Sequence, residues 1–285
     1  MVQSLSRPLI LLAAALALVA CDKLPGRAPP GPVFDKAALE AGLDPSIGGP
    51  DTCVVMLDAK TGASIYQYGA PSVCNRPLPP CNTFNIPLAL IGLDDAKLNP
   101  DEVVAWDGKP QPFKAWEHDV NLGGAWRTGS GWFFQKLARD IGPDGFRQQL
   151  SAFGYGQGQP IGAPEAFWQG PAAGGGLFIS TAGQAAFLRK MAVAELPIKP
   201  QAIDEVWGLM ADQTRSHVVL ADIGASCSTL ANDARSVSWW IGRMRGPDRD
   251  RVFAVSIESD KPLPGFEIRT RLIPIFAHTG LLPVS

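Results

Sequence analysis

The chain has 285 residues, of which 46% are hydrophobic and 18% are charged, and its formal net charge at pH 7 is −2. This composition is that of a globular protein with enough apolar residues for one full core or two small ones. A nucleic-acid partner requires a concentrated basic surface, and because the sequence contains no run of Lys or Arg, we exclude nucleic acid as a partner.

The start of the chain has the pattern of a bacterial export signal. Arg7 precedes an apolar run from Leu9 to Ala20, which is too short to cross a membrane as a helix of the mature protein. The sequence Leu18-Val19-Ala20-Cys21 is similar to a lipobox, in which the cysteine becomes the lipidated first residue. We therefore predict a signal peptide over residues 1–20 and lipidation of Cys21. An uncleaved anchor or a plain secretory signal is the alternative.

This signal also predicts where the protein resides. A Pro- and Gly-rich tether over residues 21–34 would separate the lipid from a folded domain over residues 35–285. The expected location is the bacterial periplasm, with the chain held on a membrane by its lipid. Asp22 favours the inner membrane, by a rule that applies in enteric bacteria.

Export places the remaining cysteines in an oxidising compartment, where they are expected to pair. Four remain after lipidation, and sequence alone leaves all three pairings open: Cys53, Cys74, Cys81 and Cys227. The three histidines lie far apart without the spacing of metal ligands: His118, His217 and His278. We therefore predict no metal site and no cofactor.

Periodic segments at the start of the folded domain predict one helix and a β-hairpin. A helical pattern covers Asp35 to Leu43, and β-rich runs cover Thr52 to Asp58 and Ala63 to Tyr68. The Lys60-Thr61-Gly62 sequence between the two runs is a hairpin signal. This part of the chain is predicted to contribute two antiparallel strands.

The middle of the domain is predicted to be helical. Pro87 lies in the opening turns of the first helix, where a missing N–H is tolerated, and Ser180 is a suitable N-cap for a later one. The predicted helices are Asn82–Leu93, Gly131–Asp140, Phe146–Phe153, Ala182–Ala192 and Gln201–Ala211.

Strand patterns return near the end of the chain and are followed by one more helix. The predicted elements are strands at His217–Asp222, Ser226–Leu230, Ser236–Met244 and Arg251–Ser256, and a helix at Phe266–His278. Strands at both ends with helices between them predict an α+β fold. Its antiparallel sheet is built from both chain ends and flanked by helices, and a helical lobe is inserted.

One segment resembles the active-site helix of a known enzyme family. Residues 80–93 read Pro-Cys-Asn-Thr-Phe-Asn-Ile-Pro-Leu-Ala-Leu-Ile-Gly-Leu, and class D serine β-lactamases have Pro-x-Ser-Thr-Phe-Lys-Ile-Pro-x-Ala-Leu-Ile-Gly-Leu there. Further matches to that family lie at Trp132–Arg139, Phe153–Gly156, Phe167–Gly170, Leu177–Ser180, Gln184–Leu188 and Trp239–Gly242. The resemblance covers most of residues 50–280 and implies the penicillin-recognising fold of β-lactamases and transpeptidases.

The two residues that perform the family's chemistry are absent from this segment. Asn82 stands where the family has its nucleophilic serine, and Asn85 stands where it has the lysine that serves as general base. An acyl-transfer enzyme needs both groups one helical turn apart, and an asparagine amide supplies neither. No serine in the chain has a lysine three positions later, so the pair has not moved elsewhere as Ser-x-x-Lys.

The other family motifs are also altered. The Ser-x-Val motif places Gly129 at the serine, although a shift of one residue would place Ser130 there. The Lys-Thr-Gly motif falls at residues 224–227, with Ala225 and Ser226 in place of the lysine and threonine. The positions that the resemblance assigns to the lining of the former cleft are Tyr155, Gln157, Trp168 and Ser226. Core packing is the alternative role for the tryptophan.

These replacements predict an envelope lipoprotein with a β-lactamase-like fold that does not hydrolyse β-lactams. Such a pseudoenzyme is expected to bind a peptidoglycan-derived peptide, a β-lactam or an envelope protein through the former cleft. The alternative is an unusual active β-lactamase or penicillin-interactive hydrolase that uses Ser130 or another recruited residue.

The resemblance also implies a disulfide pattern. Cys81 immediately precedes the position of the lost nucleophile, and Cys227 lies at the end of the vestigial Lys-Thr-Gly strand, which runs beside the start of the active-site helix in this fold. The expected pairs are therefore Cys81–Cys227 across the former active site and Cys53–Cys74. The local alternative joins Cys74 to Cys81.

Overall fold

The structure is a computed structural model that describes residues 34–215, 218–230, 235–247, 249–261 and 263–282. The predicted signal peptide, Cys21 and almost all of the tether lie outside the described residues, as does His217. Within the described part of the chain, no helix is long and apolar enough to cross a membrane.

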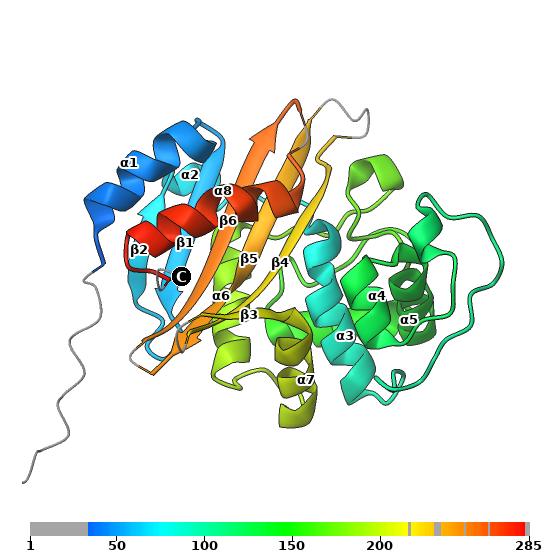
Figure 1. Ribbon diagram of the computed structural model, residues 1–285. Helices are drawn as coiled ribbons and strands as arrows, with labels where there is room; N and C mark the ends of the chain where they lie inside the picture. The colour runs from blue at the N-terminus through cyan, green and yellow to red at the C-terminus, as the bar shows by residue number, and fades with distance from the viewer. Residues whose placement is uncertain (1–33, 216–217, 231–234, 248, 262, 283–285) are drawn as a thin grey trace, which may run out of the picture. The chain divides into compact units, whose positions relative to one another are not determined.

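A six-stranded antiparallel sheet forms the centre of the fold (Figure 1). Its strands are β1 (Thr52–Asp58), β2 (Ser64–Tyr68), β3 (Ala211–Arg215), β4 (Val218–Ser228), β5 (Ser236–Gly246) and β6 (Arg249–Ser259), in the order β2-β1-β6-β5-β4-β3. The contact between β1 and β6 joins the two ends of the chain, as predicted, and Val54 lies opposite Val255 in that pair.

Helices cover both faces of the sheet and form the lobe beside it. They are α1 (Lys36–Ile47), α2 (Pro71–Cys74), α3 (Asn85–Asp94), α4 (Leu122–Thr128), α5 (Gly131–Phe153), α6 (Thr181–Ala192), α7 (Pro200–Met210) and α8 (Gly265–His278). One face of the sheet is covered by α1 and α8, and the opposite face by α6 (Figure 1). The structure confirms the predicted α+β architecture with an inserted helical lobe.

Local sequence explains where these helices begin. The Asp35 carboxylate accepts a hydrogen bond from the backbone N–H of Ala38, and the Ser180 hydroxyl accepts one from Gly183, at 2.9 and 3.0 Å. Both side chains are thus N-caps that satisfy free N–H groups in a first turn.

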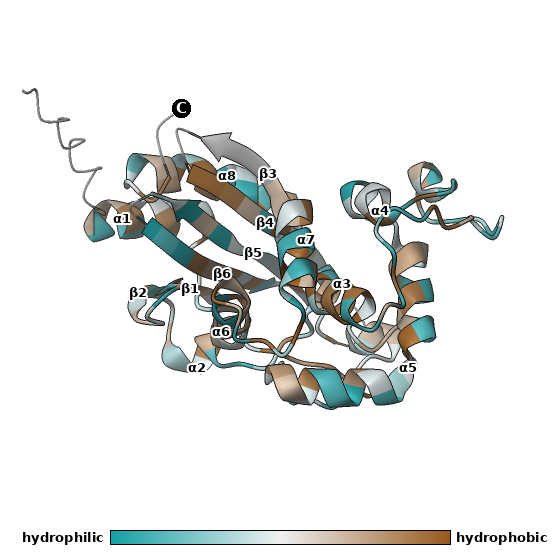
Figure 2. Cartoon of the chain, turned by 90° about the horizontal axis from the view of Figure 1, so that it is seen from below, coloured by the Kyte–Doolittle hydropathy of each residue, from teal (hydrophilic) through white to brown (hydrophobic). Residues whose placement is uncertain are grey.

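The helix α3 is apolar along most of its length (Figure 2) and is buried from Asn85 to Gly92, because it lies between the sheet and the helical lobe.

The structure differs from the prediction in several elements. The strands predicted at residues 217–222 and 226–230 are one continuous strand, β4. The two helices predicted over residues 131–153 form α5, which is kinked at Gly142, where φ is +75° and Pro143 follows. The predicted active-site helix opens with a 3₁₀ turn, η1 (Cys81–Phe84), before α3 begins.

Candidate functional site

The turn that leads into α3 is held from three sides. The indole N–H of Trp239 donates to the carbonyl oxygen of Pro79 at 2.9 Å, and the backbone N–H of Cys81 donates to the carbonyl oxygen of Trp168 at 3.0 Å. Cys81 itself has a φ of +52°, which is uncommon for a residue other than glycine, and it is bonded to Cys227 on β4. These contacts fix the position of η1 against the sheet.

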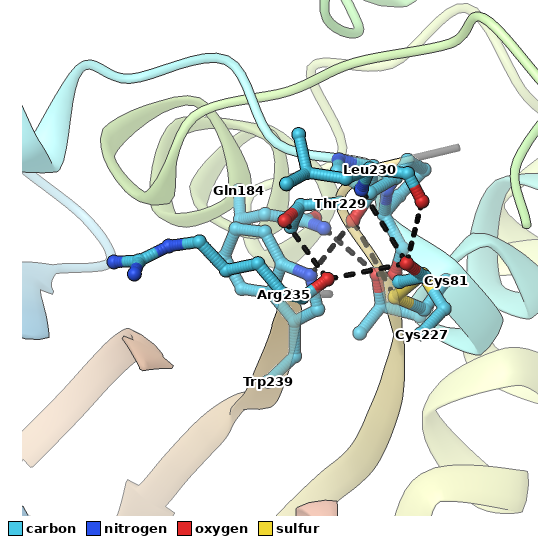
Figure 3. Close-up of a disulfide and its surroundings, with 11 residues drawn as sticks. Cys81, Gln184, Cys227, Thr229, Leu230, Arg235 and Trp239 are labelled. Carbon is cyan, nitrogen blue, oxygen red and sulfur yellow. Dashed lines mark hydrogen bonds between the residues drawn. A yellow bond between two sulfur atoms is a disulfide. The ribbon is translucent and has the colours of Figure 1, made fainter. Parts of the chain in front are cut away.

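Both predicted disulfides are present, with Cα–Cα distances of 5.6 Å for Cys81–Cys227 and 5.3 Å for Cys53–Cys74. The Cys81–Cys227 bond joins the start of η1 to the end of β4 (Figure 3). Next to it, the backbone N–H of Thr229 donates to the carbonyl oxygen of Arg235 at 2.8 Å. The bond thus crosses the place where the family's nucleophile and its Lys-Thr-Gly strand face each other.

Neither asparagine at the former catalytic positions is placed for acyl transfer. Asn82 is exposed on η1, whereas Asn85 is 6% exposed and its buried Oδ1 has no hydrogen-bond partner among the described residues. An amide next to an amide offers no group that can remove a proton near neutral pH. This arrangement supplies neither a nucleophile nor a general base.

The former Ser-x-Val position contains a single hydroxyl group, and it is inaccessible. Gly129 ends α4 with a φ of +67°, a conformation that favours glycine. Ser130 is fully buried, and its Oγ lies 2.7 Å from the Oγ1 of Thr128. Among the described residues, the side-chain partner of Ser130 is thus another hydroxyl group, which is not a base that would activate it.

On β4, the backbone next to Ala225, the position that the resemblance assigns to the lysine, is in close contact with the start of α8. Ala225 is 7% exposed, while Ser226 next to it is exposed beside the disulfide. A Cβ added to the preceding Gly224 would lie 2.6 Å from the carbonyl carbon of Gly265 at the start of α8. The absence of side chains at both glycines allows α8 to approach β4 here, and the side chain of Ala225 offers no cation to a substrate carboxylate.

Two of the four predicted cleft-lining residues are core residues instead. Tyr155 is 0% exposed and Trp168 is 1% exposed, because both pack against Phe84, at ring-centroid distances of 5.9 and 5.4 Å. Burial also raises the pKa of the Tyr155 hydroxyl well above its ordinary value, so the group stays protonated. Gln157 is exposed, but it hydrogen-bonds the backbone of Gly176 and Phe178 in the neighbouring loop.

A polar contact that the sequence did not reveal supports η1 from behind. The Thr83 hydroxyl donates to the carbonyl oxygen of Pro80 at 2.6 Å and accepts from the Gln184 amide of α6 at 2.8 Å. Both side chains are fully buried. Because Thr83 and Gln184 are 101 positions apart, no local pattern identifies this pair.

An open groove of about 1050 Å³ begins next to the altered β4 segment and runs between α4, α7, β4 and α8. We call it the α4–α8 groove. Its walls include Arg127, Glu205, Asp222, Gly224 and Phe266. The Asp222 carboxylate accepts hydrogen bonds from Trp240 and from Arg269, at 2.5 and 2.7 Å. The groove therefore combines apolar surface with charges of both signs.

Among the residues that the structure describes, no group of three His, Cys, Asp or Glu side chains is placed to hold a metal ion.

Comparison with known proteins agrees with this geometry. The family description "Penicillin binding protein transpeptidase domain" matches residues 52–271. β-Lactamase OXA-5 of Pseudomonas aeruginosa is 31% identical over 183 residues, which are 64% of this chain and 67% of that protein. The regulatory protein BlaR1 of Bacillus licheniformis is 28% identical over 206 residues, which are 72% of this chain and 33% of that protein.

A solved structure gives the same result in three dimensions. The C-terminal domain of the Bacillus licheniformis BlaR penicillin-receptor has a TM-score of 0.75 and 25% identity, and the match covers 86% of this chain and 96% of that one. With a family match over most of its length and these relatives, the chain belongs to the penicillin-binding protein transpeptidase family, as a relative of the class D β-lactamases.

Proposed function

We propose that the protein is a non-hydrolytic member of this family that binds a cell-wall-derived peptide reversibly. The observation that carries the proposal is the pair Asn82 and Asn85 at the start of α3, with the Cys81–Cys227 bond beside it. Loss of both nucleophile and base from a serine hydrolase lowers turnover by about 10⁶-fold. That factor corresponds to about 8 kcal/mol of lost barrier stabilisation.

No observation favours the alternative that Ser130 is a replacement nucleophile. Its side chain is fully buried, and its Oγ is paired with Thr128. A nucleophile must be reached by the substrate and must lie within hydrogen-bond distance of a base. Ser130 meets neither condition.

The α4–α8 groove is the surface that we assign to the ligand. A peptide presents both charged and apolar groups, and the groove offers Arg127, Glu205 and the exposed ring of Phe266. A relative described as a penicillin-receptor supports ligand binding as a use of this fold. We also propose that the predicted lipid on Cys21 holds the domain at the periplasmic face of a membrane, where such peptides occur.

The first test is for chemistry. The purified chain should neither hydrolyse nitrocefin nor gain the mass of one penicillin after incubation. The variant that combines Asn82→Ser with Asn85→Lys should also remain far below an ordinary class D enzyme, because Ala225 leaves no cation for the substrate carboxylate. Ser130→Ala serves as the matched control. A covalent adduct that this control abolishes would establish the Ser130 alternative and refute the proposal.

The second test is for binding. A soluble peptidoglycan stem peptide should bind the purified chain in calorimetry, and Arg127→Glu in the groove should weaken its affinity by about tenfold. Arg147→Glu, which changes an exposed arginine on α5, should leave the affinity unchanged. Equal weakening by both variants would show a non-specific charge effect and would contradict the groove assignment.

A further inference from the structure

A second cavity, of about 430 Å³, lies next to the α4–α8 groove, with which it shares Asp204, Gly208 and Ala211 as lining residues. We call it the α7 pocket. Its walls come from the end of α6, from α7 and from the faces of β4 and β5, and most of them are apolar: Met191, Ala192, Ala194, Pro200, Ile203, Trp207, Gly208, Ala211, Val219 and Ala221. This volume and composition are those of a small-molecule site, which needs a few well-placed polar groups in addition.

Strand geometry places two arginines in this pocket. Arg243 and Arg245 are two residues apart on β5, so their side chains lie on the same face of the sheet. Their register partners on β4 are Ala221 and Val219, which also line the pocket. Arg243 is buried at 8% exposure, whereas Arg245 is exposed at the rim. The pocket is therefore apolar at its walls and basic along one side.

The buried arginine is held in a fixed orientation with part of its guanidinium group uncommitted. Its Nε and Nη2 donate to the two carboxylate oxygens of Asp250 at 2.7 and 2.6 Å, and its Cζ lies 5.2 Å from the ring centroid of Trp207. Within the described part of the chain, no hydrogen bond is recorded for its Nη1. Such a preorganised donor is suited to a carboxylate ligand.

A second donor, on the lining residue Trp207, also lacks an acceptor among the described residues. The indole Nε1 of Trp207 is buried and has no hydrogen-bond partner among the described residues. A buried donor of this kind costs free energy unless a ligand or an ordered water accepts from it. Asp204, the acidic residue in the wall, is exposed, and Asp250 is already bonded to Arg243. The unsatisfied groups of the pocket are therefore donors.

From this arrangement we propose that the α7 pocket binds a small organic carboxylate with an apolar body. The carboxylate accepts from Arg243 and from the Trp207 indole, Arg245 adds charge at the rim, and the hydrocarbon part contacts the apolar walls. This site is separate from the former catalytic position and does not depend on the proposed function.

The test uses 4-phenylbutyrate as the probe and 4-phenyl-1-butanol as a probe of the same shape without the charge. Calorimetry on the purified chain should give a dissociation constant below about 1 mM for the carboxylate, and binding of the alcohol should be at least about tenfold weaker. Trp207→Phe keeps an aromatic ring but removes the N–H. It should weaken the affinity for the carboxylate about five- to tenfold while leaving the affinity for the alcohol unchanged.

Charge reversals locate the site. Arg245→Glu at the exposed rim should weaken the affinity for 4-phenylbutyrate by at least about tenfold. The same change at Arg127 in the α4–α8 groove should leave that affinity unchanged. Thermal unfolding checks that each variant is folded. The proposal is overturned if acid and alcohol bind equally, if the carboxylate does not bind at about 10 mM, or if Arg127→Glu weakens it as much as Arg245→Glu.

Discussion

The segment formed by η1 and the first turn of α3 has a packing side and a solvent side, and these two sides differ in how closely their residues match the family. On the packing side, Phe84 contacts Trp168, Phe167, Tyr155 and Phe146, with ring centroids 5.1 to 5.9 Å apart. On the solvent side, the family's nucleophile is replaced by an exposed asparagine, Asn82. The fold depends on the packing side, and the chemistry depends on the other.

This difference explains why the family can be identified although asparagines stand at the two positions that the resemblance assigns to the family's reactive groups. Buried aromatic residues contribute several kcal/mol each to stability, whereas an exposed polar residue contributes little. Side chains on the solvent side can therefore change without loss of the fold. A fold of this kind indicates ancestry, and the function must be argued from the site itself.

The largest effect is expected on the packing side. Phe84→Ala removes a fully buried ring from this cluster and should lower the free energy of unfolding by about 3–5 kcal/mol. Asn82→Ala, two residues away on the exposed side, should change it by less than about 0.5 kcal/mol. Urea denaturation of the purified variants measures both. Similar losses in the two variants would show that the two sides are not energetically distinct.

The disulfide at the boundary between the two sides should have the next largest effect. Cys81→Ala with Cys227→Ala opens a loop of 146 residues, for which the chain-entropy model gives at most about 5 kcal/mol and measured values are typically about 2–4 kcal/mol. Cys53→Ala with Cys74→Ala opens a loop of 21 residues and should cost less, at most about 3 kcal/mol. A larger loss from the shorter loop would contradict this order.

A charged network away from η1 should have a smaller and pH-dependent effect. Asp51 accepts a hydrogen bond from Arg76 at 2.8 Å and another from Arg235 at 2.5 Å. The hydrogen bond from Arg76 is the main reason that the pKa of Asp51 lies below its ordinary value. A lowered carboxyl pKa stabilises the fold above the unfolded-state pKa of about 3.9, and this contribution is lost as the pH falls through the folded-state pKa.

Arg76→Gln should therefore lower the free energy of unfolding by about 1–2 kcal/mol at pH 7. The difference from the unmodified chain should shrink as the pH falls through the Asp51 pKa. Denaturation midpoints between pH 7 and pH 2 measure it. Lys36→Gln, which removes an exposed pair with Glu40, is the control and should show almost no pH-dependent difference. A difference that is constant with pH would exclude the ion pair as its cause.

Local patterns were sufficient for most of the sheet. The β-rich composition of residues 52–58 predicted β1 over the residues that it occupies, and the hairpin signal predicted β2 beside it. The interruption predicted between residues 222 and 226 was wrong, because β4 continues through Gly224, where the missing side chain allows the close approach of Gly265. The edge strand β3 was missed, and the helix predicted there ends at Met210.

The candidate site depended on contacts that sequence does not reveal. The resemblance predicted both disulfides correctly, but it assigned Tyr155 to an open cleft, although Tyr155 is a core residue. For Trp168 the structure agrees with core packing, the alternative to a place in the cleft. The hydrogen bond from Trp239 to Pro79 joins residues 160 positions apart. Neither this contact nor the α7 pocket has a local signature, because each is formed by segments that meet only when the chain folds.

The smallest effect should occur at Asn85, where the two sides meet. Its Oδ1 is buried without a partner among the described residues, so the native state carries the cost of a desolvated acceptor. Asn85→Leu keeps the branching and the number of heavy atoms of the side chain but is somewhat larger and has no polar atom, and replacement of an unsatisfied polar group by an apolar one is neutral or stabilising where the shape is accommodated. We expect the free energy of unfolding to rise by up to about 1 kcal/mol in urea denaturation.

Asn85→Asp provides the sharpest control for this interpretation. The side chain keeps its shape but places a carboxylate where the amide oxygen has no donor, and a buried unpaired charge is far more costly than a buried amide. The variant should be less stable than the unmodified chain at pH 7, and the difference should diminish in acid, where the carboxyl group is neutral. If Asn85→Leu instead loses more than about 1 kcal/mol, the amide has a partner such as an ordered water, and this position is part of a polar site and not a remnant of one.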